Sequence, residues 1–176
     1  MENKPKKINQ IEPNNKVRKM LSDWGLSHIH TPDDLVNLRT KMMSVLTFRP
    51  YHNETKNGER KIRWKRTGAQ ILEDGYVYQS KACTDLVVAF ITLSRVINAS
   101  TRFVKLKSPS GKVHSLGEFK LVDGWYIFDV ASTNSVPIKG EITKNNPWGE
   151  YFLWKKGRDS WDLGLVEHDS INKINI

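Results

Sequence analysis

One cysteine, one histidine and one aspartate stand in an order that suits nucleophilic chemistry. Cys83 is the only cysteine in the 176 residues and begins an apolar run, and His114 and Asp129 follow it. A thiol at the start of a helix ionises readily, because unpaired backbone N–H groups and the helix dipole stabilise the thiolate. An imidazole can serve as its base, and a carboxylate can hold that imidazole in one tautomer. These three residues are therefore a candidate catalytic triad.

The elements that must position the triad follow from the pattern of apolar side chains. Ser80 is a candidate N-cap, which places Cys83 at the third position of a helix that is apolar on nearly every face and stops at Asn98. Alternating side chains and turn residues predict strands at 101–107, 113–121 and 125–128. We expect a buried helix followed by three antiparallel strands, with the thiol, the imidazole and the carboxylate close together.

Four short motifs between residues 78 and 132 match the core of a known family in order and in spacing. They read Cys83-Thr84-Asp85, Asn98-Ala99-Ser100-Thr101-Arg102, His114-Ser115-Leu116-Gly117-Glu118 and Gly124-Trp125-Tyr126-Ile127-Phe128-Asp129. This ordered set resembles the transglutaminase-like superfamily, a branch of the papain-like cysteine enzymes.

The resemblance implies an α+β fold with a papain-like, transglutaminase-like core. In that core a buried nucleophile helix packs on an antiparallel sheet, and helices precede it. The resemblance also implies that Cys83 is the nucleophile, His114 the general acid and base, and Asp129 its orienting partner.

Two positions depart from the family pattern close to the expected site. Lys81 stands where the family has a glycine two residues before the cysteine, and Leu116 replaces an aromatic residue that often follows the histidine. Both changes bear on how a substrate reaches the thiol.

The reaction implied is acyl transfer on an amide of a protein or peptide, through a thioester intermediate. The oxyanion would need two donors. One is the backbone N–H of Cys83, and the side-chain candidates for the other are Gln79, Gln70 and Trp64. We expect hydrolysis, as by a peptidase or amidase, in preference to transglutamination, because the sequence lacks further modules that would dock an acceptor protein. Neither a cofactor nor a metal is expected.

Two alternatives belong to other classes of function. A free cysteine in a core helix is often only a small buried side chain, so a catalytically inactive protein with the same fold is one alternative. The net charge of +9 raises the other, a basic module that binds nucleic acid or another polyanion. Its candidate residues surround Trp64 and are Arg60, Lys61, Arg63, Lys65 and Arg66. A solvated basic strand with Ile62 and Trp64 facing inward is the favoured explanation of this segment.

The remaining sequence predicts a single domain over residues 16–176 after a poorly ordered tail at 1–15. Helices are expected at 16–24 and at 32–46, the second with Thr31 as its N-cap and Pro32 in its first turn. The segment 51–65 reads as a polar loop grading into a strand, 151–154 and 161–166 as short strands or packed aromatic segments, and 170–176 as a fraying end.

The composition fits an ordinary folded protein, with 38% hydrophobic and 27% charged residues. No apolar run approaches the roughly 20 residues that cross a bilayer, and the polar N-terminus lacks the apolar segment of a signal peptide. We therefore expect a cytoplasmic protein without a membrane partner. His28 and His30 lie near Asp33 and Asp34, but helix capping explains these acids better than metal binding.

Overall fold

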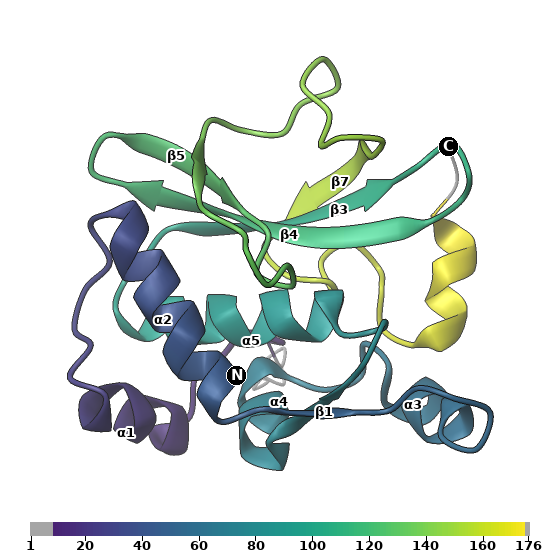
Figure 1. Ribbon diagram of the computed structural model, residues 1–176, viewed down its shortest axis with the longest axis horizontal. Coiled ribbons are helices and arrows are strands. Elements are labelled where there is room, and N and C mark those ends of the chain that lie inside the picture. Colours follow the sequence, from purple (N-terminus) through teal and green to yellow (C-terminus); the bar gives the residue numbers. More distant parts are fainter. Residues whose placement is uncertain (1–8, 175–176) are drawn as a thin grey trace, which may run out of the picture.

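A five-stranded antiparallel sheet lies over a layer of helices in the computed structural model, which describes residues 9–174 (Figure 1). The strand order is β6-β5-β4-β3-β7, so the strand expected to carry His114 is central. The strands are β3 (Thr101–Lys107), β4 (Val113–Leu121), β5 (Gly124–Phe128), β6 (Ile138–Lys139) and β7 (Phe152–Gly157). The three strands predicted from residues 101–128 are thus present, and β7 extends the sheet beyond β3.

The helix α5 (Cys83–Val96) runs beneath this sheet and carries the largest share of the core (Figure 1). Phe90 contacts Phe119 of β4 and Phe128 of β5 edge to face, with ring centroids 5.1 and 5.7 Å apart. Asn98 adopts a left-handed conformation with φ of 57°, and the chain turns there toward β3 as the sequence predicted. The helix therefore fixes the position of Cys83 through its packing.

The start of α5 differs from the sequence-based prediction. Cys83 is the first residue of the helix and not the third, and Ala82 occupies the N-cap position without a side-chain cap. Ser80 has a positive φ of 60° and belongs to a turn before the helix. The backbone N–H of Cys83 therefore belongs to the first turn, where backbone donors have no partner within the helix.

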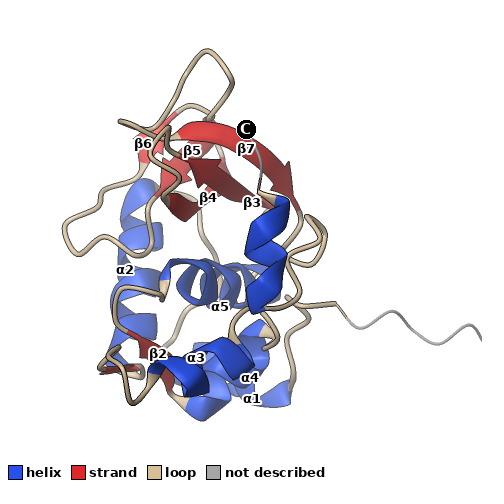
Figure 2. Cartoon of the chain, turned by 90° about the vertical axis from the view of Figure 1, so that its right-hand side faces the viewer, coloured by secondary structure: helices blue, strands red, loops and turns tan. Residues whose placement is uncertain are grey.

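The other elements lie around α5, most of them on its side away from the sheet (Figure 2). The capping box of Thr31 and Asp34 starts the second helix, in agreement with the sequence, and the first two helices lie within about two residues of their predicted bounds. These elements are α1 (Asn15–Asp23), α2 (Pro32–Ser44), β1 (Thr47–Arg49), α3 (Lys56–Ile62), α4 (Gly68–Asp74), β2 (Tyr76–Tyr78) and the 3₁₀ helix η1 (His168–Lys173).

The predicted N-terminal tail is packed over its described part. Gln10 is 1% exposed and Ile11 is fully buried. The amide of Gln10 donates to the carbonyls of Trp64 and Arg66, and its oxygen accepts from the backbone and hydroxyl of Ser160. The prediction of a tail is therefore wrong for residues 9–15, because these contacts come from distant segments that local composition does not report. Residues 1–8 lie outside the described residues.

Two further segments differ from the sequence-based expectation. Residues 56–62 form the helix α3 and not a loop grading into a strand. Residues 168–173 form η1, with Ser170 and Ile174 buried, so the expected fraying is wrong for 170–174, and 175–176 lie outside the described residues. Within residues 9–174, no helix combines the length and the apolar character needed to cross a membrane.

Candidate active site

The structure brings the three predicted residues together from three different elements. Cys83 begins α5, His114 is the second residue of β4, and Asp129 directly follows β5. The Nε2 atom of His114 lies 2.8 Å from Oδ2 of Asp129. A second side-chain hydrogen bond joins His114 to Cys83. Because Nε2 faces Asp129, Nδ1 is the ring nitrogen left for the sulfur. The three side chains form one hydrogen-bonded line.

The backbone around Asp129 holds this carboxylate in place. Its second oxygen, Oδ1, accepts a hydrogen bond of 3.1 Å from the backbone N–H of Ala131. Arg39 of α2 donates from Nε to the carbonyl of Val130 at 2.8 Å, which ties the segment after β5 to the helical layer. The Asp129 carboxylate is therefore held by its own hydrogen bond to Ala131, and the backbone next to it is held by Arg39.

The environment of Cys83 favours its thiolate. Burial opposes ionisation, but the hydrogen bond with His114, the charges of Lys105 and His114, and a hydrogen bond with Ser115 together outweigh it. They lower the pKa of the Cys83 thiol from its ordinary value of 9.0 to about 6.

The same contacts favour the protonated imidazole of His114. Burial lowers its pKa, while the hydrogen bond with Asp129, the hydrogen bond with Cys83 and the charges of both partners raise it from 6.5 to about 9. Near neutral pH the site therefore holds a thiolate beside an imidazolium, which is the reactive state of a cysteine nucleophile.

Cys83 opens on a cavity of about 370 Å³. The cavity is lined by residues from the segment after α3, the turn before α5, strand β3 and the turn between β3 and β4. Tyr151 also lines it and lies beside the His114 ring, with the two ring centroids 5.6 Å apart. The lining residues are Arg63, Trp64, Ser80, Lys81, Cys83, Thr84, Lys105, Gly111, Lys112, Val113, Tyr151 and Ile171. This volume gives a reactant room beside the sulfur.

Lys105 of β3 is a site residue that the sequence-based analysis missed. It is 1% exposed, although lysine is rarely buried without a partner, and it lines the cavity with Cys83. Its Nζ atom lies 2.9 Å from the hydroxyl of Ser115, 3.3 Å from that of Thr84, and 5.2 Å from the centre of the Trp64 ring. Burial lowers the pKa of Lys105, and the Cys83 thiolate opposes that shift. No carboxylate of residues 9–174 forms an ion pair with it, so the thiolate is its nearest anionic counterpart.

The donor properties of the ammonium fix the direction of two hydrogen bonds in this network. An ammonium only donates, so Ser115 and Thr84 both accept from Lys105. The two hydroxyls lie 2.9 Å apart, and Ser115 also bonds Cys83. With Thr84 donating to Ser115, the hydroxyl hydrogen of Ser115 points at the sulfur. A buried lysine on a predicted strand, opposite a serine on the next, is the signal that could have identified this network.

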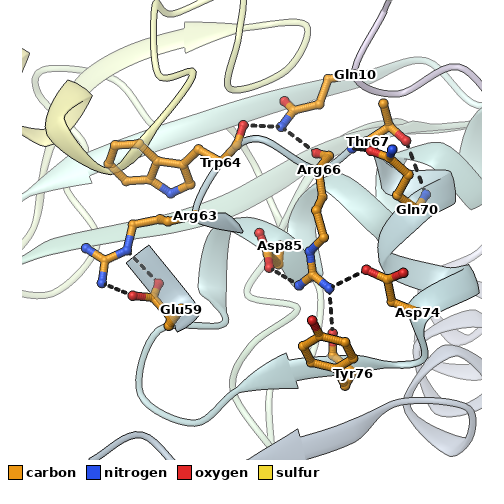
Figure 3. A network of polar contacts seen from close by, with 10 residues as sticks. All are labelled: Gln10, Glu59, Arg63, Trp64, Arg66, Thr67, Gln70, Asp74, Tyr76 and Asp85. Carbon is orange, nitrogen blue, oxygen red and sulfur yellow. Dashed lines mark hydrogen bonds and ion pairs between the residues drawn. The ribbon is translucent and has the colours of Figure 1, made fainter. Parts of the chain in front are cut away.

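The three side-chain oxyanion candidates occupy different places. Trp64 lines the cavity, whereas Gln70 and Gln79 are exposed and are not lining residues. Gln70 forms the capping box of α4 with Thr67 (Figure 3). Gln79 follows β2, and its backbone N–H donates to the carbonyl of Arg49. Of these candidates, only Trp64 contributes to the wall around the thiol.

Trp64 is held in an uncommon backbone conformation. Its φ is 61°, in the left-handed region that bulky residues rarely adopt. The side chains of Gln10 and Trp161 both donate to its carbonyl, at 3.4 and 2.6 Å. Strained residues of this kind cluster at functional sites, where surrounding contacts over-determine them.

The segment with five basic residues does not form the predicted strand. It comprises the end of α3 and the turn after it; Arg60, Lys61 and Lys65 are exposed, whereas Arg63 and Arg66 are bound inside the protein (Figure 3). Arg63 binds Glu59 through two contacts of 2.6 Å, and Arg66 binds Asp85 at 2.6 Å and Asp74 at 3.0 Å. Trp64 is 4% exposed and has no open face on which a base could stack. These contacts do not support the polyanion-binding alternative.

Comparison with solved structures identifies the fold. A candidate cysteine protease of Cytophaga hutchinsonii matches with a TM-score of 0.56 at 14% identity, over 89% of this chain and 48% of that one, so this chain spans about half of its length. LapG of Legionella pneumophila matches with a TM-score of 0.53 at 13% identity, over 92% of this chain and 91% of that one. A TGase structure matches 71% of this chain and 31% of that one, with a TM-score of 0.43 at 14% identity.

The fold is therefore α+β, as the sequence predicted, and is the one found in a candidate cysteine protease and in LapG. No protein-family model matches the chain. No curated protein matches it either.

Proposed function

We propose that this chain catalyses cysteine-dependent acyl transfer on amide bonds of proteins or peptides, with hydrolysis as its main outcome. The observation that carries the proposal is the line of Cys83, His114 and Asp129 beside a cavity of about 370 Å³. The likeness to a candidate cysteine protease supports a proteolytic member of this fold.

In the acylation step, the thiolate of Cys83 attacks the amide carbonyl carbon and forms a C–S bond. The carbonyl electron pair moves onto oxygen, where the backbone N–H of Cys83 and the indole N–H of Trp64 are the proposed donors. Collapse of this intermediate breaks the C–N bond, and the imidazolium of His114 gives its proton to the departing nitrogen.

In the deacylation step, His114 takes a proton from water, and the oxygen of that water attacks the thioester. The C–S bond then breaks and returns Cys83 as a thiolate. A low thiol pKa makes sulfur a better leaving group, so the contacts that stabilise the thiolate serve both steps.

The test is mass spectrometry of a peptide mixture rich in glutamine, incubated with the protein and a primary amine. Hydrolysis of peptide bonds, deamidation and amine incorporation each change the peptide masses differently. The proposal predicts products with the wild type and none with Cys83→Ala. If wild-type and Cys83→Ala samples are identical for every peptide tested, the alternative of an inactive protein with this fold is correct.

A further inference from the structure

The cavity beside Cys83 has a one-sided charge. Four of its twelve described lining residues are basic, namely Arg63, Lys81, Lys105 and Lys112, and no aspartate or glutamate of residues 9–174 lines it. A cleft lined by one sign of charge focuses the electrostatic field and concentrates ligands of the opposite sign.

Two of the four cations are already balanced within the protein. Arg63 is bound through two contacts by the buried Glu59. Lys105 is buried, donates to two hydroxyls and interacts with the charge of the Cys83 thiolate. Neither is free to select a ligand.

Lys81 and Lys112 are the cations left for a ligand. Both are exposed and both line the cavity, from opposite segments: the turn before α5 and the turn between β3 and β4. Lys81 lies 5.1 Å above the ring of Tyr51, and Lys112 has a loose pair with the exposed Glu150 at 3.7 Å. An exposed pair of this length contributes little energy and is easily exchanged for another carboxylate.

We propose that Lys81 and Lys112 select substrates with an acidic side chain, aspartate or glutamate, next to the amide bond that Cys83 attacks. This inference rests on the proposed function and deepens it, because it names the substrate class. It also gives a role to the lysine that replaces the family glycine at position 81. A basic side chain there favours a substrate carboxylate.

Alkylation of Cys83 tests the charge preference without a known substrate. Iodoacetate and iodoacetamide attack the same sulfur, but only iodoacetate carries a carboxylate. We expect the iodoacetate-to-iodoacetamide rate ratio at low salt to exceed that of a small free thiol by about tenfold, as for a steered anion. High salt should remove this preference.

Substitutions assign the preference to the two lysines. Lys81→Gln/Lys112→Gln should bring the ratio close to that of the small thiol, and Lys81→Glu/Lys112→Glu should invert it. The matched control is Lys19→Gln/Lys120→Gln, which removes two exposed lysines, one on α1 and one at the far end of β4 from His114. This control should keep the wild-type ratio.

A pair of peptide electrophiles then tests the side chain itself. The two probes differ only in having glutamate or glutamine next to the reactive group. The glutamate probe should label wild type faster and lose that advantage in Lys81→Gln/Lys112→Gln. Equal labelling by both probes would overturn the inference, even with a preference for iodoacetate.

The outcomes separate this inference from the proposed function. An activated Cys83 whose rate ratio equals that of a small thiol would refute the acidic preference and leave acyl transfer standing. A Cys83 that reacts with iodoacetamide no faster than an ordinary thiol would refute both.

Discussion

The ammonium of Lys105 lies 2.9 Å from the hydroxyl oxygen of Ser115, which in turn bonds the sulfur of Cys83. The Cys83 thiolate therefore has two cationic neighbours that favour it, His114 and Lys105, the second of which also acts through Ser115.

Lys105→Met should raise the pKa of the Cys83 thiol. The substitution keeps a long side chain in the buried space but removes the positive charge that stabilises the thiolate. An opposite charge at close range shifts a pKa by about 1–3 units, so the onset of iodoacetamide alkylation should move up in pH by a comparable amount. The measurement is the alkylation rate from pH 4 to pH 10.

Lys107→Met is the matched control for this prediction. Lys107 lies two residues further along β3, and its ammonium donates to the carbonyl of Ile174 and not to the site. It should leave the alkylation profile unchanged. A Lys105→Met profile that coincides with the wild type would show that the lysine only fills space.

Activity should follow a bell-shaped pH profile. Below about pH 6 Cys83 is protonated, and above about pH 9 His114 loses the proton that the leaving group needs, so kcat/KM should fall on both sides. The two limits belong to the coupled pair. The measurement is kcat/KM as a function of pH, for hydrolysis of a peptide that the mass spectrometric test has identified as a substrate.

Asp129→Asn should narrow this profile from both sides. Loss of the carboxylate lowers the pKa of His114, which moves the alkaline limit down. A less charged imidazole stabilises the thiolate less, which moves the acid limit up. A profile that only falls in height, with both limits in place, would contradict the orienting and electrostatic role of Asp129.

Local patterns were sufficient to predict the elements that carry the triad. The alternation in residues 101–107 and 113–121 predicted β3 and β4, and the apolar run after Cys83 predicted α5. Lys105 was missed because β3 is buried on both faces, and the partners that permit a buried lysine come from Thr84 and Ser115, on other elements.

The helix α3 was missed for a similar reason. The basic residues at its end and in the turn after it resemble a solvated basic strand, but Arg63 binds Glu59, and Arg66 binds Asp74 and Asp85, which lie beyond the segment. Pairing over such sequence distances is set by the tertiary fold, which local periodicity does not report.

Trp64→Phe tests the second oxyanion donor. The phenyl ring retains most of the wall of the cavity but lacks the indole N–H. Loss of one such donor typically lowers kcat by a factor of about 100–1,000, with a smaller effect on KM. Gln79→Ala, which changes an exposed side chain outside the cavity, should retain the wild-type kcat. An unchanged kcat in Trp64→Phe would remove Trp64 from this role.

Arg66→Met should destabilise the protein far more than removal of a surface cation. Arg66 is the buried partner of Asp85, which follows Cys83 by two residues at the start of α5, and their side chains are 7% and 14% exposed. Burial raises the pKa of Asp85, and the arginine opposes that shift. Breaking a buried pair by removing one partner costs about 3–5 kcal/mol, because the other charge stays uncompensated.

The free energy of unfolding, measured in urea, gives this cost. Lys19→Met is the control, because Lys19 and Asp23 form an exposed pair that should contribute about 0–1 kcal/mol. The deficit of Arg66→Met should shrink as the pH falls, because a protonated Asp85 needs no cation. Arg66→Met/Asp85→Leu should recover much of the loss at neutral pH. A deficit equal to that of Lys19→Met would mean that water or a local rearrangement solvates Asp85, and that the ion pair does not anchor the first turn of α5.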